Sequence, residues 1–162
     1  GEFGLRKGAI YIIEAFNKLS NKNFSLKVAG NIDINRKFLE TNFTNFEGHC
    51  SFEMIKKLFL WADIFIMPSL AEGSAIAGSE AICSGVPVIA TKESGINFKQ
   101  NFNGKLIKSS DSNSLYIALN ELYTNRLLLK ELISNCCKKS YKDFSHDIYN
   151  KKLLKFFINL NS

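Results

Sequence analysis

Two glutamates, Glu72 and Glu80, lie eight positions apart, and the residues between them, Gly73 to Ser79, are all small or aliphatic. A carboxylate offers two strong hydrogen-bond acceptors, so each glutamate is a candidate ligand-binding group. The absence of bulk between them would let a large ligand approach the backbone closely. The alternative is that Glu72 is an exposed turn residue and Glu80 lies on a solvated helix face.

A strand at 63–67, a loop at 68–73 and a helix from about Ser74 are expected in this part of the chain. The start of a helix has unpaired N–H groups and the positive end of the helix dipole, which suits a phosphate. Gly73 and Ala75 would leave that position accessible. Tight packing of a helix against a sheet is the other reason for small residues. It is the expected role of Gly78, Ser79 and Gly85.

A second candidate anion site involves Arg6 and Lys7, at the start of a helix expected over residues 8–20. Cations at that end of a helix oppose its dipole by a few tenths to ~1 kcal/mol each. An anion bound between them would remove the conflict, whereas simple solvation of both side chains is the alternative. Two helix starts that both suit anions favour a diphosphate as the ligand.

Short apolar segments alternate with segments of helical spacing along the chain. The expected strands end at Gly30, Gly48 and Pro68, and two more cover 87–91 and 104–108. The expected helices cover 8–20, 35–41, 51–62 with Ser51 as N-cap, 74–84, a segment after Asp111 or Ser112, and much of the remainder. This pattern predicts an α/β fold with a doubly wound, mostly parallel sheet and helices on both faces.

The start of the chain is expected to be a loop and a helix, with no strand before them. We therefore expect residues 1–162 to be a single domain, and a fragment of a two-domain protein whose first strand is missing. The segment LFLWADIFIM is too short and too polar, because of Asp63, to span a bilayer.

The net charge is +6, from 21 lysine and arginine residues against 15 aspartate and glutamate residues. An anionic ligand, a nucleic acid or an acidic membrane surface would suit this charge, but no basic block favours nucleic acid. The four cysteines have no CxxC spacing, which argues against a zinc or disulfide framework. Without a signal-peptide pattern in the first residues, we expect a reduced, cytoplasmic setting.

The segment PSLAEGSAIAGSEAICSGVPVIAT resembles the signature of the group 1 glycosyltransferases, retaining enzymes with the GT-B fold. That signature has a Pro-Ser strand end, two glutamates separated by seven residues, and then Ala-x-x-x-Gly-x-Pro-Val-Ile. It maps onto Pro68, Ser69, Glu72, Glu80, Ala81, Gly85, Pro87, Val88 and Ile89. The resemblance runs from Leu5 to Tyr123, and it implies a donor-binding C-terminal domain, one Rossmann-like half of a GT-B fold.

The resemblance also implies a role for each charged candidate. Glu80 would accept hydrogen bonds from the ribose of a nucleotide-sugar donor, and Glu72 would hold hydroxyls of the transferred sugar. Arg6 and Lys7 would neutralise the diphosphate as it leaves, because the developing charge is on phosphate oxygens. This catalysis requires no metal ion, and we expect no cofactor beyond the donor itself.

Backbone groups complete the implied site. Contacts to the sugar or the diphosphate are implied for Gly73, Ser74, Ala75 and Ile76. The loop after Gly48, around His49 and Cys50, would lie near a uracil or guanine base, with Gly30 at the same edge. Three departures from the family pattern concern the donor: Ser74-Ala75 replaces an aromatic-Gly pair, Ala77 replaces a proline, and the loop KESGINFKQN lacks the glutamate that often follows its glycine.

The resemblance therefore predicts the donor half of a hexosyltransferase that acts in polysaccharide or other glycan synthesis. The acceptor site would belong to an N-terminal domain, which could also bring the enzyme to the inner face of a membrane. This half alone would bind the nucleotide sugar but transfer little or no sugar. The alternatives are a nucleotide-sugar epimerase of the same fold and a non-catalytic nucleotide-sugar-binding module.

Overall fold

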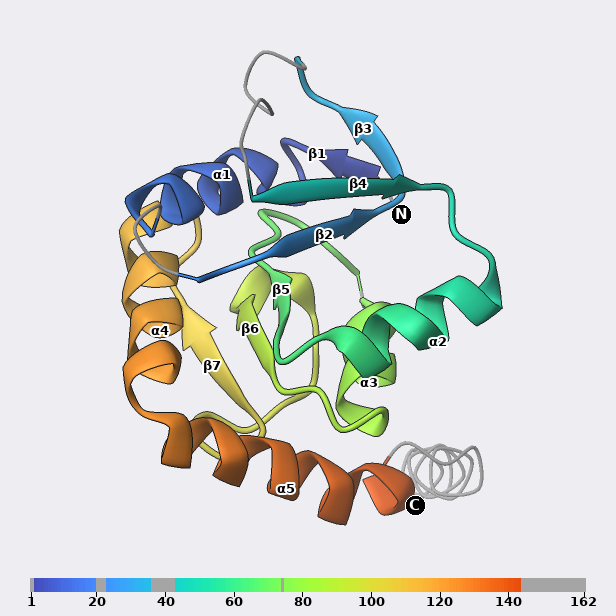
Figure 1. Cartoon of the computed structure of the whole chain (residues 1–162), viewed down its shortest axis with the longest axis vertical. Helices are drawn as coiled ribbons and strands as arrows, with labels where there is room; N and C mark the ends of the chain where they lie inside the picture. Colours follow the sequence, from blue (N-terminus) through green and yellow to red (C-terminus); the bar gives the residue numbers. More distant parts are fainter. Residues whose placement is uncertain (1, 20–22, 36–42, 74, 144–162) are drawn as a thin grey trace, which may run out of the picture.

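The computed structural model describes residues 2–19, 23–35, 43–73 and 75–143, in which parallel strands lie between helices (Figure 1). The strands are β1 (Glu2–Gly4), β2 (Leu26–Ala29), β3 (Asn31–Asp33), β4 (Thr44–Gly48), β5 (Phe65–Met67), β6 (Val88–Thr91) and β7 (Gly104–Ile107). The α-helices are α1 (Ala9–Lys18), α2 (Phe52–Trp61), α3 (Ile76–Cys83), α4 (Ser112–Thr124) and α5 (Arg126–Asp143), with a short 3-10 helix, η2 (Lys92–Ser94), after β6. No described helix is long and apolar enough to cross a membrane.

The strands that pair within the described residues run parallel to each other. β1 pairs with β3, β2 pairs with β4, and β5, β6 and β7 form a three-stranded sheet in that order. Parallel strands that pair place their carboxyl ends at the same edge, and the connections between them must cross over the sheet. The predicted α/β class with parallel strands and covering helices is confirmed.

Strand β6 shows why helices cover both faces. Successive side chains of a strand point to opposite faces. Val88 belongs to a core cluster with Ala81 and Ile82 of α3, whereas the adjacent Ile89 belongs to the larger cluster that includes α1 and α4. All residues of β6 are buried, which explains its continuous apolar sequence. In Figure 1, α1 and α4 lie on one side of β6, and α2 and α3 lie on the other.

Helices α1 and α4 follow from apolar spacing and capping. α1 buries Ile13 and Phe16 on one face, as the spacing predicts, and packs against α4. The Asp111 carboxylate caps α4 by accepting hydrogen bonds from the N–H groups of Asn113 (2.9 Å) and Ser114 (3.0 Å). α2 also begins as predicted, because the Ser51 hydroxyl accepts from the Met54 N–H at 3.3 Å.

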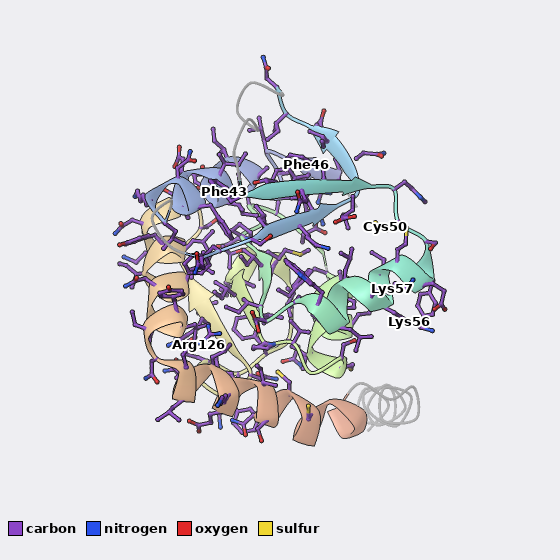
Figure 2. The ribbon with its side chains drawn as sticks, in the orientation of Figure 1. Phe43, Phe46, Cys50, Lys56, Lys57 and Arg126 are labelled. Atoms are coloured by element: carbon purple, nitrogen blue, oxygen red, sulfur yellow. The ribbon has the colours of Figure 1, made fainter. Side chains whose placement is uncertain are left out.

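Contacts between phenylalanine rings connect the β4 region to β1 and α1. Phe46 lies edge-on to Phe3 of β1, with ring centroids 6.1 Å apart. Phe43, just before β4, packs on Phe16 of α1 at 5.5 Å. Both β4-side rings are labelled in Figure 2. These contacts attach the short strand β1, and hence the loop that follows it, to the core.

The prediction that no strand precedes the first helix is wrong. Residues Glu2–Gly4 form β1, in which Phe3 lies opposite Ile32 of β3. β3 was not expected either, since three residues, Asn31–Asp33, are too few to show an alternating pattern. A missing first strand therefore no longer supports the expectation that the chain is a fragment. The helices expected at 35–41 and beyond residue 143 lie, apart from Asn35, outside the described residues.

The small residues near α3 have different roles. A Cβ on Gly78 would lie 2.3 Å from the Ile96 side chain, so Gly78 permits close packing, against a loop rather than the sheet. Gly85, expected to do the same, instead ends the helix with φ 84°. Its N–H donates to Ile82 O at 3.0 Å, while the Val86 N–H donates to Ala81 O at 2.9 Å. This pair of hydrogen bonds is the Schellman arrangement, for which glycine is preferred.

Candidate active site

Two loops that follow strands, β1–α1 and β5–α3, touch each other. The Leu70 N–H donates to the Arg6 carbonyl at 2.8 Å. Gly8 makes this approach possible, because it has φ 75° and a Cβ there would lie 2.1 Å from the Pro68 carbonyl oxygen. A side chain at that position would therefore meet both backbone strain and a direct clash. Glycine at the start of α1 thus brings the Arg6–Lys7 segment to the loop that carries Glu72.

The side chains of Arg6, Lys7 and Glu72 meet where these loops touch. Both cations form an ion pair with the same oxygen, Oε1 of Glu72. Arg6 Nη1 also donates to the Ala71 carbonyl at 3.1 Å. The Arg6 side chain is 55% exposed, but Lys7 is 21% and Glu72 only 13% exposed. Glu72 is therefore the most enclosed member of the cluster, and Arg6 is the most exposed.

The cluster sets the charge state of Glu72. The hydrogen bond from Lys7 is the main reason that the pKa of the Glu72 carboxyl lies below its ordinary value. Burial acts in the opposite direction, and the charge of Lys7 and the contacts of Arg6 add to the lowering of the pKa. Glu72 is thus ionised at neutral pH, and Arg6 and Lys7 carry one more positive charge than this carboxylate neutralises.

A pocket of about 290 Å³ adjoins the two cations. Its lining consists of Glu2, Gly4, Leu5, Arg6, Lys7 and Asp33. Of the candidate ligand-binding residues, Arg6 and Lys7 line this pocket, whereas Glu72, Glu80 and Gly30 are not part of its lining. Glu2 and Asp33 were missed by the sequence analysis, because β1 and β3 were not recognised and only their pairing places both carboxylates at this pocket.

The end of β2 contacts the end of β4, its partner strand. The Gly30 N–H donates to the Gly48 carbonyl at 2.7 Å, so the structure joins Gly30 to the loop of His49. Cys50 Sγ donates to the same Gly48 carbonyl at 3.5 Å. Cys50 lies between β4 and α2 in Figure 2, and His49 is exposed. The loop of His49 and Cys50 therefore lies at the ends of β2 and β4.

The residues around the start of α3 are placed less favourably than expected. The Ala75 N–H, one of the expected ligand donors, instead donates to the Ser94 carbonyl at 3.2 Å. Ser74 lies outside the described residues. Gly73 is exposed, and nothing lies within 4 Å of where its Cβ would be. Ile76 is 70% exposed, so the first turn of α3 is accessible.

Glu80 lies on the exposed face of α3, opposite the buried Ala81 and Ile82. Within the part of the chain that the structure describes, its carboxylate has no hydrogen bond or ion pair of the kind that engages Glu72. The two glutamates therefore differ sharply: one is held by cations, and the other is open to solvent. Among the described residues no group of three or more His, Cys, Asp and Glu side chains is placed to hold a metal ion.

Two cations, Arg6 and Lys7, and three carboxylates, Glu2, Asp33 and Glu72, gather in this region, and the two cations are the groups that could pair with an anion. Arg6 and Lys7 offer fixed positive charge at the carboxyl ends of parallel strands, where ligands bind in α/β folds.

The model of the family described as "Glycosyl transferases group 1" matches residues 1–142. The chain belongs to this family.

Relatives of this group 1 glycosyltransferase chain have been named as glycosyltransferases. An uncharacterized glycosyltransferase of Methanocaldococcus jannaschii is 26% identical over 168 residues, which is 97% of this chain and 43% of that protein. The UDP-Gal:alpha-D-GlcNAc-diphosphoundecaprenol alpha-1,3-galactosyltransferase of Escherichia coli is 35% identical over 86 residues, 52% of this chain and 22% of that enzyme. The chain spans less than half the length of either relative.

Solved structures show which part of the enzyme fold the chain forms. The C-terminal domain of a group 1 family glycosyl transferase (LpcC) from Francisella tularensis matches with a TM-score of 0.78 at 21% identity, over 90% of this chain and 85% of that structure. HepE of Anabaena, solved in complex with UDP, matches with a TM-score of 0.80 at 18% identity, over 98% of this chain and 47% of that one. The fold is that of one half of a GT-B glycosyltransferase.

Proposed function

We propose that this chain is the donor-binding half of a retaining hexosyltransferase that uses a UDP- or GDP-linked sugar. The observation that carries the proposal is the convergence of Arg6 and Lys7 on one enclosed carboxylate at the carboxyl ends of parallel strands. Family membership supports the class of reaction, and the UDP complex of the Anabaena protein supports a nucleotide ligand.

The two cations would act on the leaving group. Glycosyl transfer breaks a bond between the sugar and a diphosphate, and negative charge develops on phosphate oxygens as that bond lengthens. Fixed cations aimed at those oxygens stabilise the transition state more than the bound donor. Arg6 can donate from a planar guanidinium, and Lys7 supplies a compact ammonium that is only 21% exposed.

The carboxylates would hold hydroxyl groups. Glu80, exposed on α3, would accept hydrogen bonds from the ribose, and Glu72 would accept from the transferred sugar. Gly30 and the adjoining His49 loop would lie near the base, since Gly30 and Gly48 are joined by a hydrogen bond at the strand ends. Gly73 and Ile76 would border the sugar or the diphosphate.

Charge neutralisation by two protein cations makes a metal ion unnecessary in this proposal, and no other cofactor is involved. Binding of a nucleoside diphosphate should therefore be unchanged when EDTA replaces magnesium in the buffer. A strict requirement for a divalent cation would show that the Arg6–Lys7 pair does not carry the diphosphate.

The acceptor would bind to an N-terminal domain across a cleft from this half. We propose that the enzyme acts in the cytoplasm, at the inner face of a membrane where that domain brings it there. This chain alone should bind the donor but transfer little or no sugar, because one wall of the reaction site is absent and water screens its charges.

A thermal-shift panel tests the proposal. UDP, GDP, ADP and a single-stranded oligonucleotide are added separately to the chain, with uridine as the control that lacks phosphate. We expect UDP or GDP to raise the melting temperature and the oligonucleotide to have no effect. Stabilisation by the oligonucleotide alone would contradict a donor site. Conversion of a UDP-sugar to its epimer by the chain would show that the protein is an epimerase and not a transferase.

A further inference from the structure

The cations that the proposed function assigns to the diphosphate are already paired with Glu72. Both contact Oε1 of that single carboxylate, which is the least exposed of the three groups. A diphosphate that binds the same cations must either displace Glu72 or approach it closely. The second case brings two anions together in a partly enclosed place, where repulsion is screened less than in bulk water.

Contacts between the two loops hold the backbone from which the cations project. Arg6 is held through its carbonyl by the Leu70 N–H at 2.8 Å and through Nη1 by the Ala71 carbonyl at 3.1 Å. Lys7 precedes Gly8, whose close contact with Pro68 fixes the loop. Glu72 lies next to Gly73, which is exposed and has open space around it. The backbone that carries the two cations is therefore held in place, so a diphosphate that takes these cations must displace the Glu72 carboxylate from them.

We infer that Glu72 competes with the diphosphate for Arg6 and Lys7, and that this competition favours release of the nucleoside diphosphate after the sugar has left. The inference rests on the proposed function. With the donor bound, the sugar hydroxyls engage the carboxylate and the cations are left to the phosphates. Once the sugar is gone, the carboxylate loses those hydroxyls and returns to the cations, where it opposes the product.

The competition predicts a gain of affinity on removal of a charge. In Glu72→Gln, UDP and inorganic pyrophosphate should each bind roughly three- to tenfold more tightly, the range expected when one or two partly exposed ion pairs no longer compete. Isothermal titration of the wild-type chain and the variant with both ligands measures this. Pyrophosphate has no base or ribose, so it reports on the cation site alone.

A mutant cycle that treats Arg6→Met and Lys7→Met as one change separates competition for the cations from general repulsion. The gain from Glu72→Gln should disappear when Arg6→Met and Lys7→Met are also present, because there is then nothing to compete for. A gain that persists without the cations would overturn the inference. Thermal unfolding of each variant verifies that it is folded.

Glu131→Gln serves as the matched control. It removes an exposed carboxylate of α5 that has no role in the proposed site, so it should leave the affinities for pyrophosphate and UDP unchanged. If wild-type chain binds UDP and Glu72→Gln does not bind it more tightly, the inference is wrong while the proposed function stands. If wild-type chain binds neither UDP nor pyrophosphate, the proposed function and the inference both fail.

Discussion

At the scale of single residues, the ionised carboxylate of Glu72, in the β5–α3 loop, forms ion pairs with both Arg6 and Lys7. Its pKa lies below the ordinary value of 4.5, chiefly because Lys7 donates a hydrogen bond to it. A carboxyl with a lowered pKa in the folded chain stabilises the fold at pH above that ordinary value, and the contribution is lost as the pH falls through the lowered one.

The first prediction follows from this direction. At neutral pH, Glu72→Gln should lower the free energy of unfolding by about 0.5–1 kcal/mol, a small effect because Arg6 is largely exposed. The difference from wild type should shrink toward zero as the pH falls well below 4.5. Urea unfolding at a series of pH values measures it, and a difference that grew on acidification would contradict the ion pairs.

Glu80 is the second residue with a defined expectation. If its exposed carboxylate holds the ribose, Glu80→Ala should weaken binding of a nucleoside diphosphate by about 1.5–3 kcal/mol, the range for hydrogen bonds to a charged group. The exposed Glu131 on α5 gives a control, Glu131→Ala, that should change nothing. Equal affinity for UDP in Glu80→Ala and wild type would show that Glu80 is simply a solvated surface residue.

At the scale of elements, the contact between two strand-end loops positions the site, and Gly8 is its centre. Gly8→Ala should lower the free energy of unfolding by about 2–4 kcal/mol, from a positive φ and a clash with the Pro68 carbonyl. Gly73→Ala is the matched control, because the space around Gly73 is open and its loss should be under about 1 kcal/mol. Chemical denaturation of both variants tests this, and equal losses would contradict the loop contact.

The packing of α5 makes a separate prediction at the same scale. Burial, with smaller effects from Cys137 and Cys83, raises the pKa of the Cys136 thiol from 9.0 to about 12. Three pH units mean roughly a thousandfold less thiolate, so Cys136 should resist alkylation while the exposed Cys137 reacts. Mass spectrometry after iodoacetamide treatment tests this. Equal labelling of the two neighbours in the folded chain would show that α5 does not pack as described.

The sequence could predict those elements whose signal is local. The apolar run of β6, the spacing of Ile13 and Phe16 in α1, and the Asp111 cap of α4 all describe a residue and its near neighbours, and all three are confirmed. β1 and β3 have three residues each, which is too short for a periodic pattern, and they were missed.

The interior of the candidate site could not be predicted in the same way. Arg6 and Glu72 are 66 positions apart, and no local pattern states that they will touch. The sequence predicts either an external anion between Arg6 and Lys7 or solvation of both, whereas the structure supplies an internal anion, Glu72. The Ala75 N–H is likewise engaged by Ser94, a residue from the loop after β6 that only the folded chain brings near.

At the scale of the whole molecule, the chain carries a net charge of +6 and presents two of its cations at the strand-end edge of a GT-B half. Spread charge attracts any anion weakly, whereas the Arg6–Lys7 pair should give a specific dependence on phosphate. Removal of one lysine distinguishes the two: loss of Lys7 should weaken a local diphosphate site, whereas attraction by the net charge of the chain should depend little on which lysine is removed.

The most direct test is therefore the salt dependence of UDP binding, measured by isothermal titration for wild type, Lys7→Met and the exposed-lysine control Lys130→Met. We predict that UDP affinity falls with added salt in wild type and in the control, and that uridine affinity does not. In Lys7→Met, UDP should bind more weakly and with a flatter salt dependence. Identical affinities and slopes in all three proteins would contradict a diphosphate site at Arg6 and Lys7.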